Sequence, residues 1–146
     1  MDSAGLDAQL ETIARECVAV RLRLLNRVVT KLYDDALRPF GLKVSQLNVL
    51  VAAGKLGLAR PREVCRRLHL DTSTLSRNVE RLRARGWVEV VSGRDARTQP
   101  FRLTPAGKRL LERVIPAWAQ AQGRARALLG KEGWTWLGSA TRELRS

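Results

Sequence analysis

The 146-residue sequence predicts a mainly α-helical fold with one small β-hairpin, and three observations support this class. Apolar residues recur every three or four positions along most of the chain, which is the spacing of helices with one buried face. Alternation of apolar and polar residues replaces that spacing on the two sides of residues 92–99. An apolar content of 45% is enough to bury the core of one integrated domain.

One long helix is predicted from Asp7 to Leu37, and residues 1–38 are expected to act as an N-terminal dimerisation helix. A first apolar row has heptad spacing and consists of Val18, Leu22, Leu25, Val29, Leu32 and Ala36. A second row consists of Leu10, Ile13, Cys17, Val20, Leu24 and Val28. Because the two rows together form an apolar face that is wider than one neighbouring helix can cover, this helix should pack on its own domain and on a second chain. Pro39 and Gly41 should end it.

Three shorter helices are predicted before the hairpin. Ser45 is the expected N-cap of the first, which should end in the region of residues 54–57. Pro61 takes the first helical position of the second. Asp71 should cap the third, over residues 71–86, by accepting hydrogen bonds from its first turn.

The hairpin pairs WVEVV, residues 87–91, with PFRLT, residues 100–104. Thr104 is a plausible N-cap for the next helix, which Pro116 should bend and GKEGW, residues 130–134, should break. The C-terminal region, residues 105–146, is therefore predicted to form further dimerisation helices, the last of them short.

The helix at residues 71–86 has two different faces. At about 100° per residue, Leu75, Val79 and Leu82 form an apolar stripe. A second stripe, expected to face solvent, consists of Thr74, Arg77, Asn78, Arg81 and Arg85. Hydroxyl, amide and guanidinium groups are the ones that bind base edges in the major groove. Three short helices followed by a hairpin are also the order of a winged helix-turn-helix, here residues 39–104, with 71–86 as its recognition helix.

The charge balance points to a polyanionic partner. Lys and Arg number 27 against 14 Asp and Glu, a formal net charge of +13, so duplex DNA and an anionic membrane surface are the candidates. No apolar run reaches the length of a membrane span, and the N-terminus is acidic rather than a basic leader. A soluble cytoplasmic protein that does not bind a membrane is expected.

The turn of the hairpin carries Arg94 and Arg97, which are suited to the narrow minor groove beside a major-groove helix. Asp95-Ala96-Arg97, with Leu103-Thr104 and Gly107 after it, resembles the D-x-R-x-x-x-x-x-L-T-x-x-G signature of MarR-type regulators. The segment LDTSTLSRNVERLRARGWVEV resembles the recognition helix and first wing strand of the same family. The resemblance covers nearly the whole chain.

This resemblance implies a homodimer, held by the first and last two helices, that places two recognition helices on a pseudo-palindromic operator. It assigns Arg97 to the minor groove, with Asp95 orienting it. The recognition-helix positions fall on Thr72, Ser73, Thr74, Ser76, Arg77, Asn78 and Arg81. The sequence departs from the family in its short final helix and its glycine-broken entry, GKEGWTW.

Other chemistry finds less support. A peroxide-sensing branch of the family uses a cysteine with tyrosine partners, but Tyr33 is the only tyrosine, so Cys17 and Cys65 are expected to be inert structural thiols. Cys65 and His69 lack the further ligands that zinc requires. No catalytic set appears, so neither an enzyme nor a cofactor is predicted. Tryptophans 118, 134 and 136 are expected to fill the core or an interface, although an aromatic effector pocket would be similar to the family.

The sequence therefore predicts a sequence-specific, effector-responsive DNA-binding regulator, acting as a repressor and a homodimer, whose effector the sequence does not identify. Two alternatives stay open. A sequence-tolerant architectural DNA-binding protein would also carry a high positive charge. A winged helix can alternatively serve as a protein-interaction module, its arginines binding an acidic partner.

Overall fold

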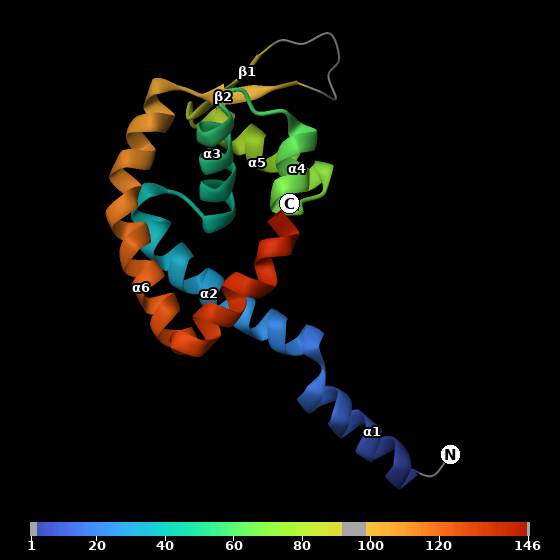
Figure 1. The fold of residues 1–146 in the computed structure, drawn as a ribbon. Coiled ribbons are helices and arrows are strands. Elements are labelled where there is room, and N and C mark those ends of the chain that lie inside the picture. The colour runs from blue at the N-terminus through green and yellow to red at the C-terminus, as the bar shows by residue number, and fades with distance from the viewer. Residues whose placement is uncertain (1–2, 92–98, 146) are drawn as a thin grey trace.

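The computed structural model describes residues 3–91 and 99–145 and has the predicted fold class: helices with a two-stranded antiparallel hairpin (Figure 1). The order of elements is α1 (Ser3–Glu16), α2 (Val18–Leu37), the 3₁₀ turn η1 (Arg38–Phe40), α3 (Val44–Leu56), α4 (Pro61–Leu68), α5 (Thr72–Ala84), β1 (Val88–Val90), β2 (Phe101–Leu103), α6 (Pro105–Arg142) and the 3₁₀ turn η3 (Glu143–Arg145). α3, α4, α5 and the hairpin form one group, α2 and α6 lie beside it, and α1 projects away.

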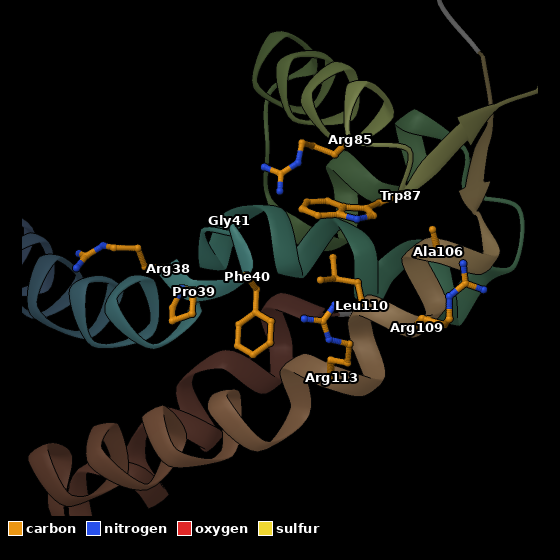
Figure 2. Close-up of a pocket in the computed structure, with 10 residues that line it drawn as sticks. All are labelled: Arg38, Pro39, Phe40, Gly41, Arg85, Trp87, Ala106, Arg109, Leu110 and Arg113. Atoms are coloured by element: carbon orange, nitrogen blue, oxygen red, sulfur yellow. The ribbon is translucent and has the colours of Figure 1, made fainter.

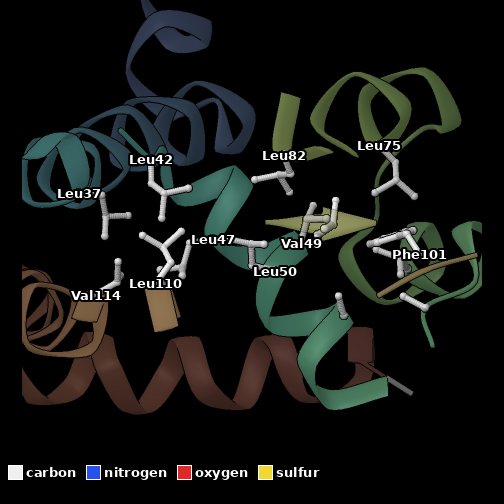
Figure 3. Close-up of a cluster of buried hydrophobic side chains, with 14 residues drawn as sticks. Leu37, Leu42, Leu47, Val49, Leu50, Leu75, Leu82, Phe101, Leu110 and Val114 are labelled. Atoms are coloured by element: carbon white, nitrogen blue, oxygen red, sulfur yellow. The ribbon is translucent and has the colours of Figure 1, made fainter. Parts of the chain in front are cut away.

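The core lies between α3 and the elements around it (Figure 3). α3 supplies four buried residues, and α2, α5, the hairpin and α6 each close one side. The largest fully buried side chains are Phe101, Leu37, Leu50, Leu75, Leu82, Val49, Val64, Val88 and Val114. Full burial of one such side chain contributes about 1.5–3 kcal/mol, so this cluster fixes how α5 and the hairpin sit on α3.

The predicted single helix over residues 7–37 is wrong at one position, because Cys17 separates α1 from α2. Its ψ of 116° is extended and interrupts the helix. The Arg21 guanidinium donates from Nε and Nη2 to the carbonyl of Arg15, at 3.1 and 2.8 Å. A basic side chain thus satisfies a carbonyl at the end of α1, so the break leaves that carbonyl with a partner. Periodicity cannot reveal such a break, since the apolar row continues through it.

The start of α3 also differs from the prediction. Lys43, not Ser45, is its N-cap, and the Gln46 side chain accepts the Lys43 N–H at 3.0 Å. Asp34 of α2 accepts the Val44 N–H at 2.8 Å, which places a carboxylate at the N-terminus of α3. This cap comes from ten residues earlier in the chain, so a search for a local cap could not identify it.

One hydroxyl joins the base of the hairpin to α6. Thr104 Oγ1 donates to the Gly86 carbonyl at 2.6 Å and accepts the Gly107 N–H at 3.1 Å, as expected of the N-cap of α6. The Thr104 N–H also donates to the Trp87 carbonyl at 3.1 Å. Gly107 packs so closely that an added Cβ would lie 2.1 Å from that carbonyl oxygen. The start of β1 and the first turn of α6 are therefore held together.

The long α6 reverses direction at a glycine. It continues through Pro116 as far as Gly130, whose φ of 71° and ψ of 171° are not helical, and this confirms the break predicted for residues 130–134. The chain end then returns to α4 (Figure 1), where His69 Nε2 lies 2.7 Å from the Leu144 carbonyl oxygen. Among the helices described, none combines the length and the apolar character that crossing a bilayer requires.

Candidate nucleic-acid interface

The N-terminus of α5 is held by Asp71. Its carboxylate accepts the Thr74 N–H at 2.6 Å and the Ser73 hydroxyl at 2.8 Å. The hydrogen bond from Thr74 is the main cause that lowers the pKa of Asp71 to about 2, and the bond from Ser73 adds to it. The ionised carboxylate thus fixes the first turn of the helix predicted to read DNA.

The outer face of α5 carries all but one of the recognition-helix side chains that the sequence nominated. Thr72, Ser73, Ser76, Arg77 and Arg81 are exposed and Thr74 is half-buried, while Leu75 and Leu82 anchor the opposite face with 2% and 1% of their surface exposed. The Arg77 Nη2 donates to Thr74 Oγ1 at 3.4 Å. Within residues 3–91 and 99–145, Arg77 and Arg81 form no ion pair, whereas Arg83 is 3.9 Å from Glu80. The face is cationic and rich in hydrogen-bonding groups.

Asn78 does not lie on this face, which corrects the predicted solvent stripe. Only 6% of its surface is exposed. The reason is helical geometry: position 78 is three residues after Leu75 and four before Leu82, so all three share the buried side. The same spacing is visible in the sequence.

The hairpin has a firm base. Val88 pairs with Leu103 and Val90 with Phe101, and an isolated bridge joins Phe101 to Ala59. On the exposed side, Arg102 Nε lies 2.5 Å from Glu89 Oε1. The predicted wing residues Arg94, Asp95 and Arg97 lie outside the described residues, so their placement at the tip stays a prediction.

The remaining candidates are scattered. Cys17 and Cys65 are free and half-buried, and burial, together with the charge of Asp71, raises the pKa of the Cys65 thiol. Within the described ranges, no three His, Cys, Asp or Glu residues cluster as metal ligands. Trp118, Trp134 and Trp136 are exposed rather than packed in the core of this chain. These tryptophans therefore do not fill the core of this chain, and their role at an interface stays a prediction.

Sequence reasoning missed a cavity between η1, the C-terminal end of α5 and the first turns of α6 (Figure 2). Its volume is about 570 Å³, and its lining includes the side chains of Arg38, Phe40, Arg85, Trp87, Arg109 and Arg113. These residues come from three separate segments, so no motif joins them. The only signal in the sequence was the excess of arginine.

Comparison with known proteins finds a family match over part of the chain and solved structures with the same fold. Residues 40–98 match the family described as the MarR family. The uncharacterized HTH-type transcriptional regulator YwoH of Bacillus subtilis is 31% identical over 88 residues, which are 60% of this chain and 64% of that protein. The multiple antibiotic resistance protein MarR of Salmonella typhimurium is 29% identical over 90 residues, 61% of this chain and 62% of that one. The aligned region thus spans just under two thirds of these curated relatives.

Solved structures share the fold over most of their length. A mutant MarR from E. coli in complex with operator DNA has a TM-score of 0.78 at 20% identity, covering 92% of this chain and 98% of that one. BpsR of Bordetella bronchiseptica has a TM-score of 0.78 at 23% identity, covering 90% and 100%. A "probable transcriptional regulator" from Pseudomonas aeruginosa has a TM-score of 0.77 at 26% identity, covering 88% and 97%.

Proposed function

We propose that this chain, whose residues 40–98 match the MarR family, is a cytoplasmic transcriptional regulator that binds duplex DNA as a homodimer. The observation that carries the proposal is the exposed face of α5. Hydroxyls lie together there with the guanidinium groups of Arg77 and Arg81, which form no ion pair with any residue that the structure describes, on a helix anchored by buried leucines. YwoH and the Pseudomonas aeruginosa protein named above are each described as a transcriptional regulator, which supports this proposal.

In this proposal α5 enters the major groove. Arg77 and Arg81 bind base edges, and the remaining contacts to bases or phosphates come from Thr72, Ser73, Thr74 and Ser76. The wing adds Arg97, oriented by Asp95, in the adjacent minor groove, with Arg94 beside it. Asn78 supports α5 from the buried side and reads no base.

The proposed dimer uses the apolar surface that this chain leaves exposed. Along α1 and α2, Leu10, Ile13, Leu24 and Val28 are each at least half exposed, and α6 adds the exposed Trp118 and Trp136. Apolar patches of this kind mark surfaces that another protein covers. A second copy, bound through residues 1–38 and 105–146, would set two α5 helices against half-sites about 34 Å apart.

Repression and control by an effector complete the proposal. A dimer that occupies a promoter blocks transcription there, and a ligand that changes the separation or tilt of the two α5 helices releases it. BpsR, which shares the fold, is described as a protein whose DNA binding is regulated by 6-hydroxynicotinic acid. That description supports a small-molecule effector for this chain without identifying one.

The test is selection of bound fragments from the host genome, followed by affinity measurement on the recovered fragment and on random duplex at equal salt. A specific regulator should prefer its fragment by about 10³-fold or more. Equal affinities would favour the architectural alternative. Failure to retard any duplex at moderate salt would favour the protein-interaction module.

A further inference from the structure

The cavity beside the C-terminal end of α5 has the chemistry of an anion-binding site. The residues that line it include four arginines, Arg38, Arg85, Arg109 and Arg113, and no Asp or Glu. Within residues 3–91 and 99–145, three of the four guanidinium groups form no ion pair, the exception being Arg38, which is paired with Asp35. In Figure 2 the Arg38 side chain also points away from the other three. Like charges gathered around one space repel each other unless an anion binds between them.

Arg85 is held in place before any ligand binds. Its guanidinium carbon lies 4.3 Å from the centre of the Trp87 ring, a cation–π contact. Its other side lies against Gly41, where an added Cβ would be 2.7 and 2.9 Å from the two terminal nitrogens. The φ of +69° at Gly41 favours glycine there, and a larger residue would also displace the Arg85 guanidinium. A cation fixed in this way loses little conformational freedom on binding.

The aromatic rings of the cavity already form cation–π contacts with two of the arginines. Trp87 contacts the Arg85 guanidinium, and the Arg113 guanidinium lies 5.8 Å from the centre of the Phe40 ring (Figure 2). Arg109 is four residues from Arg113 and lies on the same side of α6. The chemistry left for a ligand is therefore mainly that of guanidinium N–H donors, which suits an oxyanion with several acceptors.

We infer that this cavity binds the phosphate group of a small phosphomonoester, with Arg85, Arg109 and Arg113 as its ligands. A phosphomonoester carries a charge of about −1.5 to −2 and three terminal oxygens, whereas a carboxylate offers one charge and two oxygens. The cavity volume of about 570 Å³ leaves room for an organic group beyond the phosphate. The site connects the end of α5 to α6; any regulatory effect of its ligand rests on the proposed function, but binding itself does not.

Calorimetric titration of the full chain, without DNA, tests this inference. The probes are phenyl phosphate, inorganic phosphate and benzoate at pH 8. We expect saturable binding of phenyl phosphate, at least about tenfold tighter than benzoate, with inorganic phosphate binding more weakly than the ester. The double variant Arg109→Gln, Arg113→Gln should lose at least about tenfold in affinity for phenyl phosphate. The matched control Arg124→Gln changes an exposed arginine of the same helix outside the cavity and should bind like the unmodified chain.

Three results would overturn the inference: no saturable binding of phenyl phosphate, unchanged affinity in the double variant, or benzoate binding as tightly as phenyl phosphate. Weakened binding of random duplex by the double variant, without phenyl phosphate binding to the unmodified chain, would assign these arginines to the DNA backbone instead. Because the titration contains no DNA, its outcome is independent of whether the chain binds an operator.

Discussion

The Asp71 carboxylate accepts the Thr74 backbone N–H at 2.6 Å, and this contact helps to fix the end of α5 that is proposed to approach DNA. The same carboxylate accepts the Ser73 hydroxyl, so two residues of the proposed interface depend on it for their position. The acid therefore organises the interface without being a candidate for touching DNA itself.

Replacing Asp71 should reveal both the cap and its charge. Asp71→Ala should lower the melting temperature because it removes the cap, while Asp71→Asn should keep most of the stability, since Asn is also a good N-cap. The pKa of Asp71 is about 2 in the folded chain, against about 3.9 for an unfolded Asp. Because the pKa of Asp71 is lower in the folded chain than in the unfolded chain, the ionised carboxylate stabilises the folded state fully above about pH 4. That contribution is lost as the pH falls toward 2.

Chemical denaturation at several pH values measures this effect. The stability difference between the unmodified chain and Asp71→Asn should shrink between pH 5 and pH 2.5. A difference that stays constant over this range would show that the carboxylate charge does not stabilise α5.

Two glycines of α6 should respond oppositely to alanine. Gly107→Ala places a Cβ 2.1 Å from the Trp87 carbonyl oxygen, so we expect a loss of about 3 kcal/mol or more. Gly123→Ala meets no atom within 4 Å and replaces an exposed helical glycine, so we expect a gain of about 0.5–1 kcal/mol. Urea denaturation compares the two. Equal effects would contradict the close packing of Gly107.

Arg77 and Asn78 are adjacent in sequence, but replacing them should affect different properties: DNA binding for Arg77 and stability for Asn78. Arg77→Ala or Arg81→Ala should weaken operator binding by about 1–3 kcal/mol and relax the preference for one base pair. Asn78→Ala should lower the melting temperature and leave the base preference unchanged, because Asn78 is buried. Arg83→Ala is the control, since Arg83 is near Glu80 and should affect affinity evenly across sequences. Binding to a set of single-base operator variants distinguishes these outcomes.

The apolar row on α2 gives a test of assembly. Leu24 and Val28 are 55% and 50% exposed, so changing both to Asp should leave the chain folded while separating the proposed dimer into monomers. Arg23→Asp, an exposed position outside this row on the same helix, is the control and should remain dimeric. Sedimentation velocity with circular dichroism measures both properties. A folded double variant that still sediments as a dimer would place the interface elsewhere.

The sequence predicted those elements whose signals are local. Pro61, Asp71 and Thr104 each begin or precede a helix where expected, and Gly130 breaks α6, because proline, cap and glycine effects act within one turn. The alternating segments became β1 and β2 for the same reason.

What the sequence did not reveal depends on contacts between distant residues. The Asp34 cap of α3 and the arginine-lined cavity join segments that no spacing rule connects. The break at Cys17 leaves the apolar pattern intact. Asn78 is different, because its spacing from Leu75 and Leu82 is sufficient to predict that it is buried.

Thr104 has a mechanical consequence. Its hydroxyl binds the Gly86 carbonyl and the Gly107 amide at the same time, with the Trp87 carbonyl packed against Gly107. The base of the hairpin and the first turn of α6 are therefore coupled through this residue. A rotation of the first turn of α6 would therefore move the start of β1 with it.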